Sequence, residues 1–117
     1  MARILVIEDD PVVARVTELV LQRAGHRPVL ARDFLSAKSA LAEPADAVIL
    51  DINLPGGNGL ELLRHLREEL GSRTAVLILS ALKQEDVIVR GLKLGANDFL
   101  TKPFSPQELI LRLERCL

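Results

Sequence analysis

Short apolar runs alternate with longer amphipathic stretches along the whole chain. Buried strands in α/β proteins have this continuous apolar character because helices cover both faces of their sheet. The runs that predict strands are Arg3–Ile7, Pro28–Ala31, Asp46–Leu50, Thr74–Leu79 and Asn97–Leu100. The stretches that predict helices are Pro11–Ala24, a segment capped by Asp33 that runs through Ala42, Asn58 to about Leu70, Gln84–Leu94, and a last segment from Pro106 almost to the end.

Capping residues support these boundaries. Asp10 stands directly before Pro11, which fits an N-cap followed by proline at the first helical position. The segment Ser105-Pro106-Gln107-Glu108 is a full capping box for the last helix. Pro28 lacks a backbone N–H, so the second strand is expected at an edge of the sheet.

Strict alternation of strand and helix indicates right-handed crossovers and one parallel sheet. The expected architecture is a doubly wound α/β sandwich with helices on both faces. A chain of 117 residues is long enough for one domain and too short for two. We therefore expect residues 1–117 to form a single domain, with no output domain in this chain.

Polar residues follow the predicted strands where each strand ends. Glu8 and Asp9 follow the first strand, Asp51 follows the third, Ser80 follows the fourth, and Lys102 lies just beyond the fifth. The carboxyl ends of parallel strands meet at one edge of the sheet, where ligands of such folds bind. We expect these side chains to converge in one pocket.

Each of these residues alone has an ordinary explanation as a loop acid, a turn residue, a helix cap or a surface lysine. Together, crowded carboxylates repel each other and raise a pKa unless a cation compensates them. Mg²⁺ prefers oxygen ligands and shares its sites with phosphate oxygens. Asp9 and Asp51 are candidate direct ligands, Glu8 assists directly or through water, and the main-chain carbonyl of Asn53 completes the protein's share.

The same pocket suits phosphoryl transfer. A carboxylate can attack phosphorus to form an acyl phosphate, and the reaction needs mainly positioning and charge neutralisation. Asp51 is the best candidate nucleophile because it follows the central strand. The metal and Lys102 would supply positive charge, and the Ser80 hydroxyl would supply a hydrogen bond.

Composition limits the class of protein. The formal net charge is −1, no basic tract stands out and only three phenylalanines are present, so nucleic-acid binding by this domain is not expected. No apolar run approaches a membrane span, and the single cysteine, Cys116, fits a reducing compartment, so we expect a cytoplasmic protein without membrane contact. The helix predicted from Asn58 to about Leu70 has a leucine stripe formed by Leu62, Leu63, Leu66 and Leu70. His65 falls off this stripe and is expected to be exposed.

Four segments together resemble the receiver domain of two-component response regulators. They are Val6-Ile7-Glu8-Asp9-Asp10, Leu50-Asp51-Ile52-Asn53-Leu54-Pro55 with Gly59, Leu79-Ser80-Ala81, and Thr101-Lys102-Pro103-Phe104. The resemblance spans nearly the whole chain in the right order and spacing. It implies a flavodoxin-like five-stranded sheet in the order 2-1-3-4-5.

The resemblance also implies specific roles. Asp51 would accept a phosphoryl group from a sensor histidine kinase or a histidine phosphotransfer protein. Mg²⁺, with Mn²⁺ as a substitute, would be held through Glu8, Asp9, Asp51 and the Asn53 carbonyl. The Lys102–Pro103 bond is expected to be cis.

The resemblance further implies a conformational switch. Phe99, three residues before Lys102, matches the family's switch aromatic, although it also reads as a strand core residue. Phosphorylation would then repack the face formed by helix four, strand five and helix five, which controls an output partner or domain. The same face is a candidate homodimer surface, with Asp98, Glu108 and Arg112 as its charged residues, and Asp98 and Arg112 as a candidate cross-subunit pair. The module would catalyse only its own phosphorylation and slow dephosphorylation, so it is not expected to be an enzyme.

Two other functions use related sheets. A phosphatase of the haloacid-dehalogenase type needs a second aspartate two residues after the nucleophile, where this chain has Asn53. A flavin-binding electron carrier would place its phosphate beside the acids that follow the first strand, and few aromatic residues are available to stack on the flavin. Both functions therefore rank behind the phosphoacceptor switch.

Overall fold

The polypeptide folds as the alternating pattern predicts. A computed structural model describes residues 2–81 and 85–117. Its strands are β1 (Arg3–Ile7), β2 (Arg27–Ala31), β3 (Ala47–Asp51), β4 (Asn53–Leu54), β5 (Gly57–Asn58), β6 (Ala75–Ala81) and β7 (Asp98–Lys102). Its helices are α1 (Pro11–Arg23), α2 (Phe34–Ala40), α3 (Gly59–Arg64), the π-helix η1 (His65–Glu69), α4 (Glu85–Lys93) and α5 (Pro106–Cys116).

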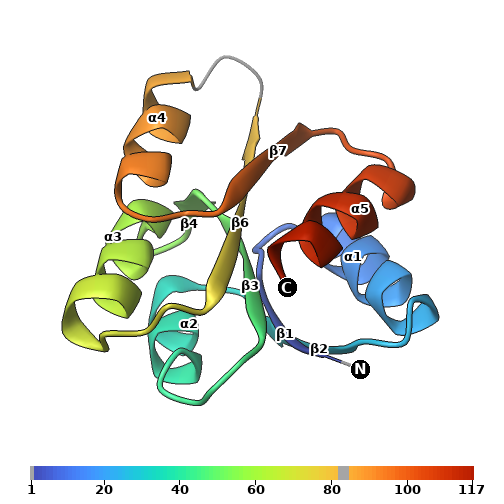
Figure 1. Ribbon diagram of the computed structural model, residues 1–117, viewed down its shortest axis with the longest axis horizontal. Helices are drawn as coiled ribbons and strands as arrows, with labels where there is room; N and C mark the ends of the chain where they lie inside the picture. Colours follow the sequence, from blue (N-terminus) through green and yellow to red (C-terminus); the bar gives the residue numbers. More distant parts are fainter. Residues whose placement is uncertain (1, 82–84) are drawn as a thin grey trace.

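Five strands form one parallel sheet in the order β2-β1-β3-β6-β7. Counted among these five strands alone, this is the expected 2-1-3-4-5 order, and the strand that contains Pro28 lies at an edge. The α2, α3 and α4 helices cover one face of the sheet, and α1 and α5 cover the other (Figure 1). The fold is the flavodoxin-like doubly wound arrangement.

Alternate residues of each central strand face opposite layers. Leu5, Ile7 and Leu50 are buried in the core beneath α2, α3 and α4. Ile4 and Ile49 are buried in the core beneath α1 and α5. Both faces of these central strands are therefore buried beneath helices, which explains why they read as unbroken apolar runs.

The caps lie where the sequence places them. The Asp10 carboxylate accepts hydrogen bonds from the amides of Val12 and Val13 at 2.8 and 3.3 Å. The Ser105 hydroxyl accepts one from the amide of Glu108 at 3.1 Å. The predicted start of the fourth helix at Gln84 lies outside the described residues, and α4 is seen from Glu85.

The third helix differs from the single helix expected from Asn58 to Leu70. It continues as a π-helix from His65, and the Leu70 amide bonds to the His65 carbonyl at 3.0 Å. The wider turn rotates Leu70 away from the leucine stripe, so its side chain is 42% exposed. The expectation that His65 is exposed was wrong, because its side chain is only 15% exposed and lies 3.3 Å from a Glu69 carboxylate oxygen.

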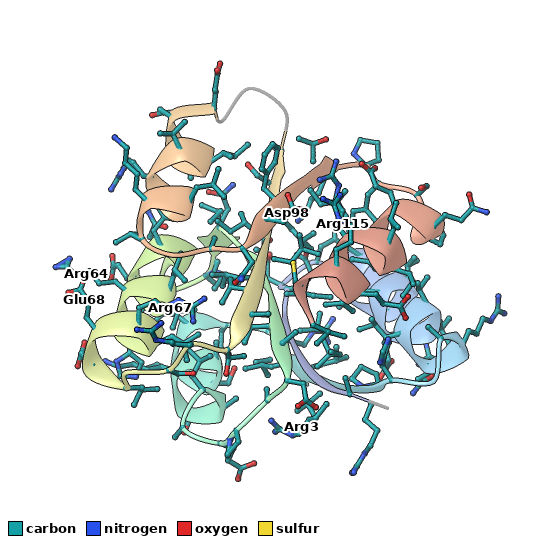
Figure 2. The ribbon with its side chains drawn as sticks, in the orientation of Figure 1. Arg3, Arg64, Arg67, Glu68, Asp98 and Arg115 are labelled. Carbon is teal, nitrogen blue, oxygen red and sulfur yellow. The ribbon has the colours of Figure 1, made fainter. Side chains whose placement is uncertain are left out.

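Arg67 ties this π-helix to the turn before β7. Its guanidinium donates to the Gly95 carbonyl at 2.8 Å and to the Ser72 carbonyl at 3.0 Å. Figure 2 shows Arg67 on the inner side of its helix, whereas Arg64 and Glu68 point outward.

None of the helices in the described part of the chain has the length and apolar character needed to cross a bilayer.

Candidate functional site

The carboxyl edge of the sheet brings together the acids expected from the sequence. Glu8 follows β1, and Asp51 is the last residue of β3, the neighbouring strand. One carboxylate oxygen from each of Glu8, Asp9 and Asp51 lies within 4.8 Å of the other two. Glu8 and Asp51 are buried, at 1% and 4% exposure, whereas Asp9 is half-buried at the rim.

Lys102 joins these acids from the end of β7. Its ammonium nitrogen lies 2.8 Å from Glu8 Oε1 and 3.1 Å from Asp51 Oδ2. The expected convergence of residues from β1, β3 and β7 is therefore confirmed for Glu8, Asp51 and Lys102. The peptide bond between Lys102 and Pro103 is cis, as the resemblance implies.

The charges in the pocket do not balance. Three carboxylates face one ammonium, and burial is the main cause that raises the pKa of Glu8 from 4.5 to about 7. Burial acts to lower the pKa of Lys102, but its contacts with Glu8 and Asp51 outweigh that effect and leave this pKa above its usual value. The pocket therefore favours any additional positive charge.

The donor set fits a small hard cation. Octahedral Mg²⁺ binds oxygens at about 2.1 Å, so its ligand oxygens lie roughly 3 to 4 Å apart. The three carboxylate oxygens need only a small inward movement to reach that spacing. Glu8 Oε1 is buried and makes an ion pair with Lys102 without a well-aligned hydrogen bond, so it retains capacity for another partner.

The remaining predicted residues lie on β4, β6 and β7. Asn53 is the first residue of β4, and its amide donates to Asp51 Oδ1 at 3.2 Å. Ser80 is fully buried near the end of β6, and its hydroxyl donates to the Ala81 carbonyl at 3.2 Å. Phe99 on β7 is half-buried and packs against the core beneath α2, α3 and α4.

The candidate dimer residues form a cluster within one chain. Arg112 on α5 contacts Asp98 Oδ2 at 3.1 Å and Glu108 Oε2 at 3.2 Å. Asp98 lies on β7 beside α5, as Figure 2 shows. The three residues are therefore close together, and this Asp98–Arg112 contact lies within one chain.

The sequence interpretation missed one close approach behind Asp51. Gly59, the first residue of α3, lies so near the Asp51 carbonyl that a side chain there would collide with backbone. Its amide donates to the Ile52 carbonyl at 2.7 Å. The sequence marked Gly59 only as a residue that accompanies the Leu50–Pro55 segment in the receiver resemblance, and nothing in it indicated this backbone contact.

The raised pKa of Glu8 gives a pH-dependent difference in stability. Without metal, between pH 4.5 and about 7, the folded state keeps a proton on Glu8 that the unfolded chain has already lost. Wild-type stability should therefore fall through this window relative to Glu8→Gln, by on the order of 3 kcal/mol above pH 7. Urea unfolding in a chelator at several pH values measures the difference. Parallel curves for the two proteins across the window would contradict it.

Comparison with known proteins identifies the family. The family model described as "Response regulator receiver domain" matches residues 4–114. The phosphate regulon transcriptional regulatory protein PhoB of Escherichia coli is 44% identical over 114 residues, which is 96% of this chain and 50% of that protein. PhoB of Pseudomonas aeruginosa is 36% identical over 116 residues, 97% of this chain and 51% of that protein. The chain thus spans about half the length of these curated relatives.

Solved structures agree with the family match. The receiver domain of the Francisella response regulator 1452 superimposes with a TM-score of 0.91 at 33% identity, over 99% of this chain and 96% of that one. The Vibrio cholerae chemotaxis response regulator CheY4 gives a TM-score of 0.90 at 28% identity, over 100% and 99% of the two chains. The chain therefore belongs to the response regulator receiver domain family of two-component signalling.

Proposed function

We propose that this receiver domain is a phosphoacceptor switch in which Asp51 receives the phosphoryl group in a Mg²⁺-dependent reaction. The observation that carries the proposal is the bridge from the Lys102 ammonium to Glu8 and Asp51, beside Asp9, at the carboxyl edge of the sheet. Asp51 is the carboxylate placed on the central strand with Lys102 in contact. That arrangement supports attack by one buried carboxylate next to fixed positive charge.

In the proposed reaction, an Asp51 carboxylate oxygen supplies the electron pair for a new bond to phosphorus. The bond from phosphorus to the donor's leaving group breaks, and its electron pair departs with that group, which is acetate when the donor is acetyl phosphate. Lys102 neutralises charge on the transferred group, and the Ser80 hydroxyl turns to donate a hydrogen bond to it.

Mg²⁺, for which Mn²⁺ can substitute, would be held by Asp9, Asp51 and the Asn53 carbonyl, with Glu8 assisting directly or through water. When bound, it supplies charge neutralisation for the acidic pocket and for phosphoryl oxygens. The three clustered carboxylates support this assignment.

The proposed partners follow from the family. A sensor histidine kinase or a histidine phosphotransfer protein would donate the phosphoryl group, and a downstream output domain or protein would read the result. Phe99 would change rotamer as Ser80 moves, repacking the face formed by α4, β7 and α5. A homodimer through that face would involve Asp98, Glu108 and Arg112, and a cross-subunit Asp98–Arg112 pair would require the intrachain pair to open.

Intact-mass measurement tests the acceptor function. Incubation of the chain with Mg²⁺ and acetyl phosphate should add the mass of one phosphoryl group. A chelator in the same mixture should prevent the addition. An unchanged mass in the presence of Mg²⁺ and the donor would overturn the proposal.

Lys102→Ala should separate metal binding from switching. Removing the ammonium leaves Glu8 and Asp51 without their shared cation, so Mg²⁺ should still bind and should raise Tm more than in the wild type. Phosphodonor should no longer shift the amide resonance of Phe99. Lys93→Ala on the exposed surface of α4 is the matched control. A normal Phe99 response in Lys102→Ala would remove Lys102 from the switch.

A further inference from the structure

The loop behind Asp51 is a small hairpin with a defined register. The β4 and β5 strands pair antiparallel, with Asn53 opposite Asn58 and Leu54 opposite Gly57. The hairpin begins with Asn53, whose amide donates to Asp51 Oδ1 and whose carbonyl belongs to the proposed metal ligands. Whatever fixes this hairpin therefore also fixes the surroundings of Asp51.

Phe34 packs on this hairpin from a different element. A side-chain carbon built on Gly57 would lie 2.7 Å from Phe34 Cγ and 2.8 Å from Phe34 Cε2. Real carbon atoms do not approach this closely, so the phenyl ring occupies the space that a residue-57 side chain would need. The Phe34 amide also donates to the Pro55 carbonyl at 3.2 Å. Both the main chain and the side chain of Phe34 therefore contact the hairpin.

The position of Phe34 is itself fixed. It is the first residue of α2, and the Asp33 cap accepts a hydrogen bond from the Ser36 amide at 2.8 Å. One turn on, Ala37 is fully buried in the core beneath α2, α3 and α4. The adjacent side chain, Leu35, points away and is 79% exposed. Phe34 is thus a half-buried aromatic residue at the start of a helix whose position is fixed by its cap and by the packing of Ala37.

We propose that Phe34 is a positioning residue for the phosphoacceptor site, acting through Gly57 and the β4–β5 hairpin on Asn53 and Asp51. The inference rests on the proposed function of Asp51. The phenyl ring of Phe34 offers no ligand atom for a metal, but its contacts with Gly57 and Pro55 limit the positions that the hairpin can adopt. Pre-organised supporting contacts of this kind strengthen metal binding without direct ligation.

A double-mutant cycle between Phe34 and Gly57 tests the proposal. Phe34→Ala frees the hairpin and should weaken Mg²⁺ affinity about tenfold. Gly57→Ala should weaken it as well, because the new methyl group collides with the ring. Gly57 has no positive φ, so alanine fits the backbone there. In Phe34→Ala/Gly57→Ala the ring is gone, and the second substitution should cost nothing further. Leu35→Ala is the matched control and should bind Mg²⁺ as the wild type does.

Hydrogen exchange without metal gives a second readout. Phe34→Ala should speed exchange of the Asn53 and Gly59 amides and leave the β1 and β6 amides unchanged. Phe34→Leu keeps part of the packing and should fall between the wild type and Phe34→Ala in both measurements. Faster exchange throughout the sheet, or additive losses of Mg²⁺ affinity in Phe34→Ala/Gly57→Ala, would overturn the proposal. Phe34 would then support only the stability of the fold.

The two proposals fail in different ways. A wild-type chain that takes up no phosphoryl group overturns the acceptor function, whatever the hairpin does. A wild type that is phosphorylated, alongside a Phe34→Ala variant with unchanged Mg²⁺ affinity and unchanged exchange at Asn53, overturns the positioning role alone.

Discussion

Asp51→Asn should abolish labelling of the chain by acetyl phosphate. The carboxamide has nearly the same shape, so Lys102 can stay paired with Glu8 and the fold should persist. Its nitrogen lone pair is delocalised and its oxygen carries no full charge, so it attacks phosphorus poorly. Loss of a nucleophile typically costs many orders of magnitude in rate, and we expect labelling to fall about a thousandfold or more. Intact mass after incubation with Mg²⁺ and donor measures the loss.

The matched control is Asp86→Asn, which removes an exposed carboxylate from α4, outside the acidic pocket. It should label like the wild type. If Asp51→Asn still gains one phosphoryl group, peptide mapping will place it on another residue, and the assignment of Asp51 fails. Circular dichroism of the variant separates loss of the nucleophile from loss of the fold.

Much of the fold followed from local chemistry that tertiary packing did not override. The unbroken apolar strands required cover on both faces, and Pro28 placed its strand at an edge. Asp10 and Ser105 cap α1 and α5 as their sequence positions predict. These signals were reliable because each involves neighbours in the chain and a requirement of the backbone itself.

The convergence of the site was also predictable, because parallel topology brings strand ends to one edge. The pKa of Glu8 and the distances between the charged side chains were not predictable from the sequence. The ordinary pKa of a glutamate applies in water, and only the three-dimensional structure shows that Glu8 is buried beside Asp51. The ammonium of Lys102 also lies closer to Glu8 than to Asp51, although two strands, β6 and β3, separate β7 from β1, and the sequence does not show this reach.

The features that sequence interpretation missed depend on contacts between distant segments. The π-helix at His65 follows from backbone hydrogen bonds that no residue type marks, and it displaces Leu70. The Phe34–Gly57 contact joins the start of α2 to a loop more than twenty positions away. A glycine in such a loop indicates either backbone freedom or close packing, and the sequence cannot distinguish the two.

Gly59 illustrates the close-packing case and should be the most sensitive glycine near the site. A side-chain carbon there would overlap the Asp51 carbonyl oxygen, and it would lie 2.8 Å from Ile52 Cα and 3.1 Å from the Ile52 carbonyl oxygen. These are backbone atoms of the strand end that carries the proposed nucleophile, so they cannot turn aside as a side chain can. Gly59→Ala should destabilise the protein by about 3 kcal/mol and lower Tm by roughly 10 °C.

Gly91→Ala on α4 provides the contrast. Its added carbon would meet the tip of Ile78, a flexible methyl group that can rotate, and Leu60 Cδ2 at 3.4 Å. Alanine also gains about 1 kcal/mol of helix propensity over glycine, which offsets much of the repacking cost. Thermal unfolding of the two variants side by side measures the difference. Equal losses would mean that the strand end behind Asp51 yields as easily as a side chain, and that this backbone does not hold the acceptor rigidly.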